Sequence, residues 1–253
     1  MTPPYWHGIQ AFVRAVLSRA GDLVKSVRSI LYLVLFLAAV IDTRSADNAA
    51  LADPVAPADP PVLVMLGDSI TAGFGLPAED ALPARLQAAL ADMGYPIEIR
   101  NAGVSGDTTA GGRERIDWSV SGDVDAVLIA LGGNDVMRAI PPEETGRNLD
   151  AMITDLKARG LQVLLAGMLA PPNYGPEFAR EFEAIYQDAA NRHEVPLYPF
   201  LLDGVVADPA LNQPDGIHPN RDGVDVMVER MTPFLIEALF DKNLEGPYSS
   251  ELN

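Results

Sequence analysis

The feature of this sequence that most restricts its fold is the regular alternation of apolar, β-prone runs with amphipathic helical patterns after residue 61. The run 62–66 is wholly apolar, and the runs 125–131 and 162–168 are almost entirely apolar after their first residue. Runs of this kind are typical of strands that are buried on both faces of a parallel sheet. Because helical patterns separate them, we expect a single α/β domain over residues 61–242.

Five strands and five helices can be assigned from these patterns. The strands are predicted at 62–66, 97–99, 125–131, 162–168 and 195–200, and the helices at 79–93, 107–117, 143–159, 176–193 and 220–241. The fifth strand contains two prolines, which lack a backbone N–H, so it is expected at an edge of the sheet. Ligands of such sheets bind beyond the carboxyl ends of the strands, which directs attention to the loops there.

The N-terminal 52 residues have a different character. Twelve consecutive apolar residues, 30–41, follow four basic residues, and small residues then offer a cleavage site after Ala52. Twelve residues span a bilayer poorly but suit the apolar region of a signal peptide. We therefore expect a periplasmic or secreted protein, with residues 53–60 as a Pro-rich linker and 243–253 as a C-terminal tail. An uncleaved membrane anchor, or a cytoplasmic protein with an over-extended start, is the alternative.

The net charge of −17 restricts the partners of this chain. Residues 1–52 carry +2, so the remaining 201 residues carry −19, from 13 basic and 32 acidic side chains. An acidic body repels phosphate backbones, so no nucleic-acid partner is expected. Contact with a membrane is expected only through the N-terminal segment, and a monomer is the favoured oligomeric state. The absence of cysteine excludes thiol catalysis, disulfides and Cys-ligated zinc.

Four polar segments should meet at one edge of the predicted sheet. Three of them end the first three strands, and the fourth lies before the last helix. They are Gly67-Asp68-Ser69, Asn101-Ala102-Gly103, Gly132-Gly133-Asn134-Asp135 and Asp215-Gly216-Ile217-His218-Pro219. A serine hydroxyl in such a place is a weak nucleophile unless a neighbouring base accepts its proton.

Elimination indicates which histidine could be that base. Of the three histidines, His7 lies in the segment predicted to be removed, and His193 ends a helix in a charged stretch typical of a solvated surface. His218 remains, and Asp215 three residues earlier can orient its ring. Acyl transfer also needs donors to a developing oxyanion. The backbone N–H groups of Ser69 and Gly103 and the amide of Asn134 are the candidates.

Taken together, the four segments resemble the SGNH (GDSL-like) hydrolases, in that family's order and approximate spacing, over roughly residues 61–241. The resemblance is strongest to the bacterial arylesterase, thioesterase and lysophospholipase branch, whose Pro-Pro-Asn-Tyr-Gly-type loop matches residues 171–175. It implies a three-layer α/β/α flavodoxin-like fold with a five-stranded parallel sheet. It also implies a triad of Ser69, Asp215 and His218, and an oxyanion hole of Ser69, Gly103 and Asn134.

The activity that this resemblance implies is hydrolysis of aryl and acyl esters, extending to thioesters and lysophospholipids, without a cofactor or a metal. Apolar residues in the loops near 74–80 and 169–180 favour an acyl chain or aryl group as the substrate contact. These residues are Phe74, Leu76, Leu169, Pro171 and Tyr174. A carbohydrate O-acetylesterase with the same triad is the alternative within the family.

Two alternatives lie outside this class. A metal-dependent phosphoesterase could use the carboxylates and Asn134 as ligands, but a two-metal site usually needs several histidines and only His218 is at hand. A non-catalytic flavodoxin-like binding module would leave the polar set without a use. Asp68 and Asp135 are expected to brace their turns rather than to react. Asp107 or Thr108 is expected to cap the helix that follows.

Overall fold

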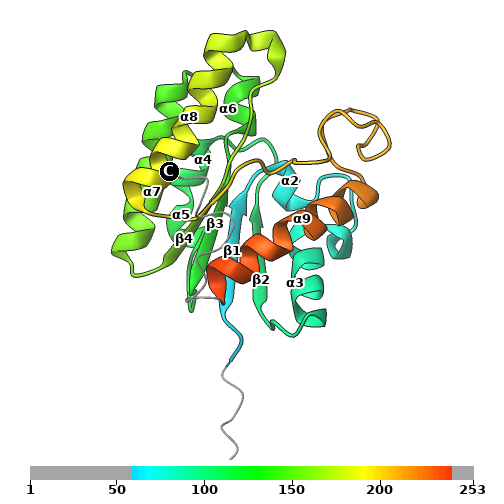
Figure 1. Ribbon diagram of the computed structural model, residues 1–253. Helices are drawn as coiled ribbons and strands as arrows, with labels where there is room; N and C mark the ends of the chain where they lie inside the picture. Colours follow the sequence, from blue (N-terminus) through cyan, green and yellow to red (C-terminus); the bar gives the residue numbers. More distant parts are fainter. Residues whose placement is uncertain (1–58, 241–253) are drawn as a thin grey trace, which may run out of the picture. The chain divides into compact units, whose positions relative to one another are not determined.

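The computed structural model describes residues 59–240 of the 253-residue chain (Figure 1). The predicted signal or anchor segment 1–52, nearly all of the linker 53–60 and the tail 243–253 lie outside the described residues. Residues 59–240 contain a five-stranded sheet in the order β2-β1-β3-β4-β5, and each pair of neighbouring strands is parallel. The predicted five-stranded parallel sheet is therefore confirmed.

Four of the strands have five or six residues, and the fifth has only two. They are β1 (Val62–Gly67), β2 (Glu98–Gly103), β3 (Ala126–Ala130), β4 (Gln162–Ala166) and β5 (Leu197–Tyr198). The central strands β1 and β3 are buried throughout, which explains their uninterrupted apolar sequences. β5 lies at an edge as predicted but has only two residues, because Pro196 and Pro199 flank it and cannot donate to the ladder.

The second strand is longer than predicted. Residues 100–103 are Arg-Asn-Ala-Gly, a sequence with little strand character, yet they pair in register with Val64–Gly67 of β1. Pairing with a buried neighbour therefore overrides local propensity at this edge. The extension carries Gly103 inside the strand rather than into the loop beyond it.

Helices cover both faces of the sheet, which gives the three layers that were predicted (Figure 1). Helices α3 (Leu82–Asp92) and α9 (Arg221–Leu239) pack together on one face, with α2 (Ser69–Ala72) near them. The other face carries α4 (Thr109–Glu114), α5 (Ile116–Ser119), α7 (Pro142–Ala158) and α8 (Pro176–His193). In α7 the apolar side chains at helical spacing are buried, and they are Leu149, Met152, Ile153 and Leu156.

Two predicted helices are interrupted. The segment 79–93 divides into a 3₁₀ turn, η1 (Ala78–Asp80), and α3, with the extended residue Ala81 between them. The segment 107–117 forms α4 and α5, separated at Arg115. The other three predicted helices agree to within two residues, and α8 matches its predicted bounds.

Two short helices that the sequence did not reveal begin directly after buried strands. α2 follows β1, and α6 (Gly133–Met137) follows β3. Four or five residues are too few to show a helical period. Both helices start at the carboxyl edge of the sheet, where they carry Ser69 and Asn134 to the same region. Within residues 59–240 no helix combines the length and apolar character needed to cross a membrane.

Candidate active site

Ser69 is the first residue of α2, at the end of the buried strand β1. The turn is held by Asp68, whose Oδ1 accepts a hydrogen bond from the backbone N–H of Ile70 at 3.0 Å. Gly67 is required before it, because a Cβ there would lie 2.0 Å from Oγ1 of Thr71. As the first helical residue, Ser69 also has a backbone N–H without a partner inside its helix.

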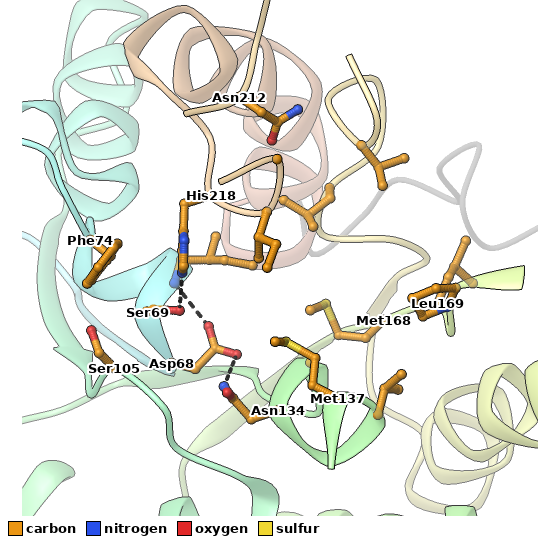
Figure 2. A pocket seen from close by; sticks show the side chains of 18 of the residues that line it. Asp68, Ser69, Phe74, Ser105, Asn134, Met137, Met168, Leu169, Asn212 and His218 are labelled. Carbon is orange, nitrogen blue, oxygen red and sulfur yellow. Dashed lines mark hydrogen bonds between the residues drawn. The ribbon is translucent and has the colours of Figure 1, made fainter. Parts of the chain in front are cut away.

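The side chains of Ser69, His218 and Asp215 form one hydrogen-bonded line (Figure 2 shows the first two). Nε2 of His218 lies 2.8 Å from Oγ of Ser69, and Nδ1 lies 2.7 Å from Oδ2 of Asp215. The other carboxylate oxygen accepts the backbone N–H groups of Ile217 and His218, at 2.9 and 3.0 Å. The structure thus brings together the three residues that the sequence singled out, although 149 positions separate Ser69 from His218.

Hydrogen bonds keep the Asp215 carboxyl ionised at neutral pH. The backbone hydrogen bond from His218, followed by the bond from its ring, lowers the pKa of Asp215 from 3.8 to about 2. The tight turn that makes these bonds needs a residue in the left-handed backbone conformation. Gly216, with a φ of 69°, adopts it. A carboxylate that is charged at neutral pH fixes the ring so that Nε2 faces the serine.

Asp68 has the opposite environment. It is buried, with 2% exposure, and burial raises its pKa from 3.8 to about 6, although hydrogen bonds from Ile70 and Asn134 oppose that shift. Its Oδ2 accepts a hydrogen bond from the Asn134 amide at 3.2 Å (Figure 2). Asp68 therefore braces the serine turn, as predicted, and it also holds Asn134 beside Ser69.

Gly103, which the sequence suggested as an oxyanion donor, does not line the cavity beside Ser69. Gly103 is the last residue of β2, and its N–H donates to Oδ1 of Asn101 at 2.9 Å. A Cβ there would lie 2.3 Å from the backbone N of Ala72. Gly103 is therefore a packing glycine, which lets β2 approach the helix that carries Ser69.

Gly106, three residues later, lines the cavity beside Ser69 and Asn134. Its φ of 84° is in the left-handed region, and its carbonyl accepts a hydrogen bond from Arg138 at 2.7 Å. The sequence signal for it was present, since Gly106 stands in the same polar loop just before the predicted helix cap. Because the strand was predicted to end at residue 99, Gly103 was assigned to the loop and Gly106 was not considered.

A buried arginine that the sequence did not single out supports this edge of the sheet. Arg115 donates to the carbonyls of Gly67 and Ala102, both at 2.8 Å, and to the Asp107 carboxylate at 2.5 Å. It thereby ties the ends of β1 and β2 to the loop that contains Gly106. Nothing in its surroundings in the sequence marks it, because these partners lie up to 48 positions away.

Three further predictions concern structural residues. Asp135 is fully buried and accepts hydrogen bonds from both the backbone N–H and the hydroxyl of Thr109, so it braces its loop as expected. Thr108 caps α4 through the N–H of Gly111. His193 is not simply solvated, because its ring lies 3.0 Å from Asp150 and only 17% of its side chain is exposed.

A cavity of about 450 Å³ opens beside Ser69 and His218. Its wall is mostly apolar, as Figure 2 shows for Met137, Met168 and Leu169. The remaining apolar lining residues are Ile70, Phe74, Val136, Pro171, Phe200, Leu202, Val206, Ala207 and Ile217. In the part of the chain that is described, no group of three or more His, Cys, Asp or Glu side chains could hold a metal ion.

Two residues predicted to contact substrate do not line this cavity. Leu76 packs against the core and lines a small neighbouring hollow, which it shares with Ser69 and His218. Tyr174 belongs to the 3₁₀ turn η2 (Pro172–Tyr174), which directs its ring onto Phe178 at 5.4 Å. Aromatic packing on α8 thus takes Tyr174 away from the site. Phe74, Leu169 and Pro171 do line the cavity.

Comparison with known proteins gives consistent results. Residues 65–226 match the model of the GDSL-like lipase/acylhydrolase family. Esterase TesA of Pseudomonas aeruginosa is 40% identical over 174 residues, covering 68% of this chain and 87% of the relative. Arylesterase of Vibrio mimicus is 35% identical over 178 residues, covering 70% and 89%. Thioesterase 1/protease 1/lysophospholipase L1 of Escherichia coli K12 is 36% identical over 178 residues, covering 68% and 84%.

Solved structures agree with this relationship. The crystal structure of TesA superposes with a TM-score of 0.67 at 38% identity, covering 70% of this chain and 99% of that one. AlinE4, described as an SGNH-hydrolase family esterase, gives a TM-score of 0.61 at 38% identity, covering 73% and 99%. The fold, the family model and the curated relatives coincide, and the chain belongs to the GDSL-like lipase/acylhydrolase family.

Proposed function

We propose that this enzyme hydrolyses carboxylic esters through an acyl-enzyme on Ser69. The observation that carries the proposal is the line from Asp215 through His218 to Ser69, with distances of 2.7 and 2.8 Å, at the wall of an apolar cavity. A hydroxyl at hydrogen-bond distance from an oriented imidazole is the arrangement that makes serine nucleophilic.

The first step is acylation of the serine. Ser69 Oγ attacks the carbonyl carbon of the ester while Nε2 of His218 accepts the hydroxyl proton. Asp215 holds Nδ1 and stabilises the imidazolium that forms. The tetrahedral intermediate then collapses, the C–O bond to the leaving group breaks, and His218 returns the proton to the departing alcohol.

Three donors support the oxyanion of that intermediate in this proposal. They are the backbone N–H groups of Ser69 and Gly106 and the side-chain amide of Asn134, all from residues that line the cavity. Gly106 replaces Gly103 in this role because the N–H of Gly103 already has an acceptor. In the second step water attacks the acyl-enzyme, with His218 again as the base, and the acid is released.

The cavity favours an acyl or aryl group over a sugar. Met137, Met168 and Leu169 contribute apolar wall beyond Asn134, whereas recognition of a sugar requires several convergent hydrogen-bonding groups. Aryl and acyl esters are thus the proposed substrates, and the names of the relatives extend the set to thioesters and lysophospholipids. A carbohydrate O-acetylesterase is the weaker candidate.

One panel of substrates tests the function. Purified enzyme is assayed with p-nitrophenyl esters from C2 to C16, an acyl-CoA, a lysophospholipid and an acetylated sugar, and Ser69 is probed with a fluorophosphonate. We expect ester hydrolysis, labelling of Ser69, and a loss of several orders of magnitude in kcat for Ser69→Ala and His218→Ala. Turnover near that of the wild type in either variant would contradict the mechanism.

The predicted export of the protein is a separate proposal. The apolar run 30–41 after basic residues, with small residues before Asp53, supports a cleaved signal peptide. Fractionation of cells that express the full chain, followed by N-terminal sequencing of the product, tests this. A mature protein that begins near Asp53 in the periplasm or medium is expected. An intact N-terminus in the membrane fraction would indicate an anchor, and one in the cytoplasm would indicate that no export occurs.

A further inference from the structure

The aromatic ring of Phe74 lies against the imidazole of His218. The two ring centroids are 4.5 Å apart and the ring planes are inclined by 35°. Figure 2 shows Phe74 beside His218, near Ser69 and away from Met137 and Met168. Half of the Phe74 surface is exposed, so its ring contacts His218 without being enclosed in the core.

A clamp from the histidine loop holds this pair together. Nε2 of Gln213 donates to the carbonyl of Phe74 at 2.7 Å and to that of Pro219 at 3.0 Å. The backbone N–H of Gln213 also donates to the carbonyl of His218 at 2.8 Å. The side chain of Gln213 therefore joins the segment after Ser69, which contains Phe74, to the loop that carries His218.

The residue after Phe74 shows how closely the two segments approach. Gly75 has a φ of 75°, and a Cβ on it would lie 2.2 Å from Oε1 of Gln213. Glycine suits this backbone conformation, and any other residue would displace the end of the Gln213 side chain. The Phe74–His218 contact is thus fixed by a glycine, a glutamine clamp and the loop geometry together.

The chemistry of the proposed reaction gives this contact a consequence. His218 becomes an imidazolium each time it accepts the serine proton, and an aromatic face within about 6 Å attracts a cation through its quadrupole. The titratable groups that face His218 are Asp215 in its own loop, Asp68 at the end of β1 and the hydroxyl of Ser69. Phe74 carries no charge, and its ring adds an attraction to the protonated imidazole at a centroid distance of 4.5 Å.

We propose that Phe74 is a positioning residue that holds the His218 ring and stabilises its protonated form during acyl transfer. The inference rests on the proposed function for its kinetic effect, although the ring contact itself acts in the resting enzyme. If Phe74 served only as apolar cavity wall, leucine would replace it with little change. If the aromatic face matters, leucine and tyrosine will behave differently.

The experiment compares Phe74→Leu with Phe74→Tyr, using Met93→Leu as a matched control because Met93 is 58% exposed and does not line the cavity. Hydrolysis of p-nitrophenyl acetate is measured from pH 4 to 9, since this short substrate depends least on the cavity wall. For Phe74→Leu we expect kcat to fall by roughly three- to tenfold, while the acid limb of kcat/KM moves to lower pH by about half a unit to one unit. Phe74→Tyr, which keeps the aromatic face, should keep the acid limb of the wild type, and Met93→Leu should match the wild type in both quantities.

In Phe74→Leu, kcat should fall while the enzyme stays active to lower pH. A merely structural defect would not produce this combination. Losing the aromatic face makes the imidazolium harder to form, so turnover slows, yet the neutral base persists to lower pH. NMR titration of the His218 ring in the resting enzyme should show the same downward movement. Gln213→Met, which keeps the aromatic ring but removes the clamp, should move both quantities in the same directions by a smaller amount.

The outcomes separate this inference from the proposed function. If the fluorophosphonate labels Ser69 but the acid limb and the NMR midpoint of Phe74→Leu match the wild type, this inference is wrong and the function stands. If Ser69 is not labelled while the NMR midpoint still moves, the proposed function fails and only the ring interaction remains. A Phe74→Tyr enzyme that behaves like Phe74→Leu would also overturn the aromatic role.

Discussion

The amide nitrogen of Asn134 lies 3.2 Å from the carboxylate of Asp68, the residue that precedes Ser69. A carboxylate only accepts hydrogen bonds, so this contact fixes which end of the Asn134 amide faces Ser69. One N–H of the amide is used by Asp68 and the other is left for the cavity. The proposed oxyanion donor is therefore oriented by a group that need not touch the substrate.

Replacing Asp68 with asparagine should lower kcat by up to roughly 10²–10³-fold, the range for losing one oxyanion donor. The introduced side chain would present its NH₂ group to Asn134, and the Asn134 amide would turn its oxygen to meet it. KM for a short ester should change much less than kcat. Steady-state kinetics with p-nitrophenyl acetate measures both quantities.

A double-mutant cycle isolates this relationship. If Asp68 acts through Asn134, the pair Asp68→Asn with Asn134→Ala should be little slower than Asn134→Ala alone. Full additivity of the two losses would show that Asp68 acts independently of the amide.

The same substitution should stabilise the fold at neutral pH. Burial raises the pKa of Asp68 from 3.8 to about 6, so between those values the folded protein binds more protons than the unfolded chain. The contribution of Asp68 is then most favourable below about pH 4 and is lost as pH rises through 6, at a cost of about 3 kcal/mol. The asparagine in Asp68→Asn does not ionise, so this variant does not lose stability as the pH rises through 6.

Denaturant unfolding at pH 4 and pH 7 measures the effect. The free energy of unfolding of Asp68→Asn, relative to the wild type, should increase from pH 4 to pH 7 by up to about 3 kcal/mol. A difference between the two proteins that does not vary with pH would mean that Asp68 titrates at its ordinary value. Together with the kinetic loss, a gain would identify Asp68 as a residue that exchanges stability for activity.

Two glycines three positions apart should respond differently to alanine. In Gly103→Ala the new Cβ would lie 2.3 Å from the backbone of Ala72 and 2.8 Å from the carbonyl of Asp68. Neither neighbour is flexible, so we expect a loss of several kcal/mol in stability and a clearly lower Tm. In Gly106→Ala the nearest atom is the end of the Arg138 side chain at 3.8 Å, so the strain is that of the positive φ alone, about 1 kcal/mol.

Activity per folded molecule then distinguishes their roles. Gly106→Ala should remain folded yet lose turnover, because a shift of its backbone would misplace a proposed oxyanion N–H. Thermal unfolding, combined with titration of active sites by a fluorophosphonate, separates the two effects. Equal turnover in Gly106→Ala and the wild type would remove Gly106 from the oxyanion hole.

These glycines also show how far the sequence could predict the site. The apolar runs identified β1 and β3 because burial on both faces leaves a continuous signal, and the polar residues after them were found for the same reason. β2 is an edge strand whose last four residues carry no such signal, so its end was placed too early. Gly103 was consequently assigned to the loop, and Gly106 was passed over.

Residues whose role depends on distant partners were the other group that was missed or misplaced. Arg115 acts on carbonyls that only the assembled sheet brings near. Tyr174 was expected in the cavity from its place in an aromatic loop, but packing on Phe178 decides its direction. The hydrogen-bonded line of Ser69, His218 and Asp215 was predictable because the chain has only three histidines, which left one candidate base.

Preference for longer acyl chains should depend on the apolar wall around Met137. This side chain lines the cavity at the end of α6 and is 56% exposed. In Met137→Asp a carboxylate would meet the alkyl chain of an octanoyl ester, so KM should rise by about tenfold, whereas KM for the acetyl ester should stay within about twofold. Met93→Asp is the matched control, since Met93 is 58% exposed at the end of α3 and lies outside the cavity. Equal changes for both esters in Met137→Asp would show that the acyl chain does not run along this wall.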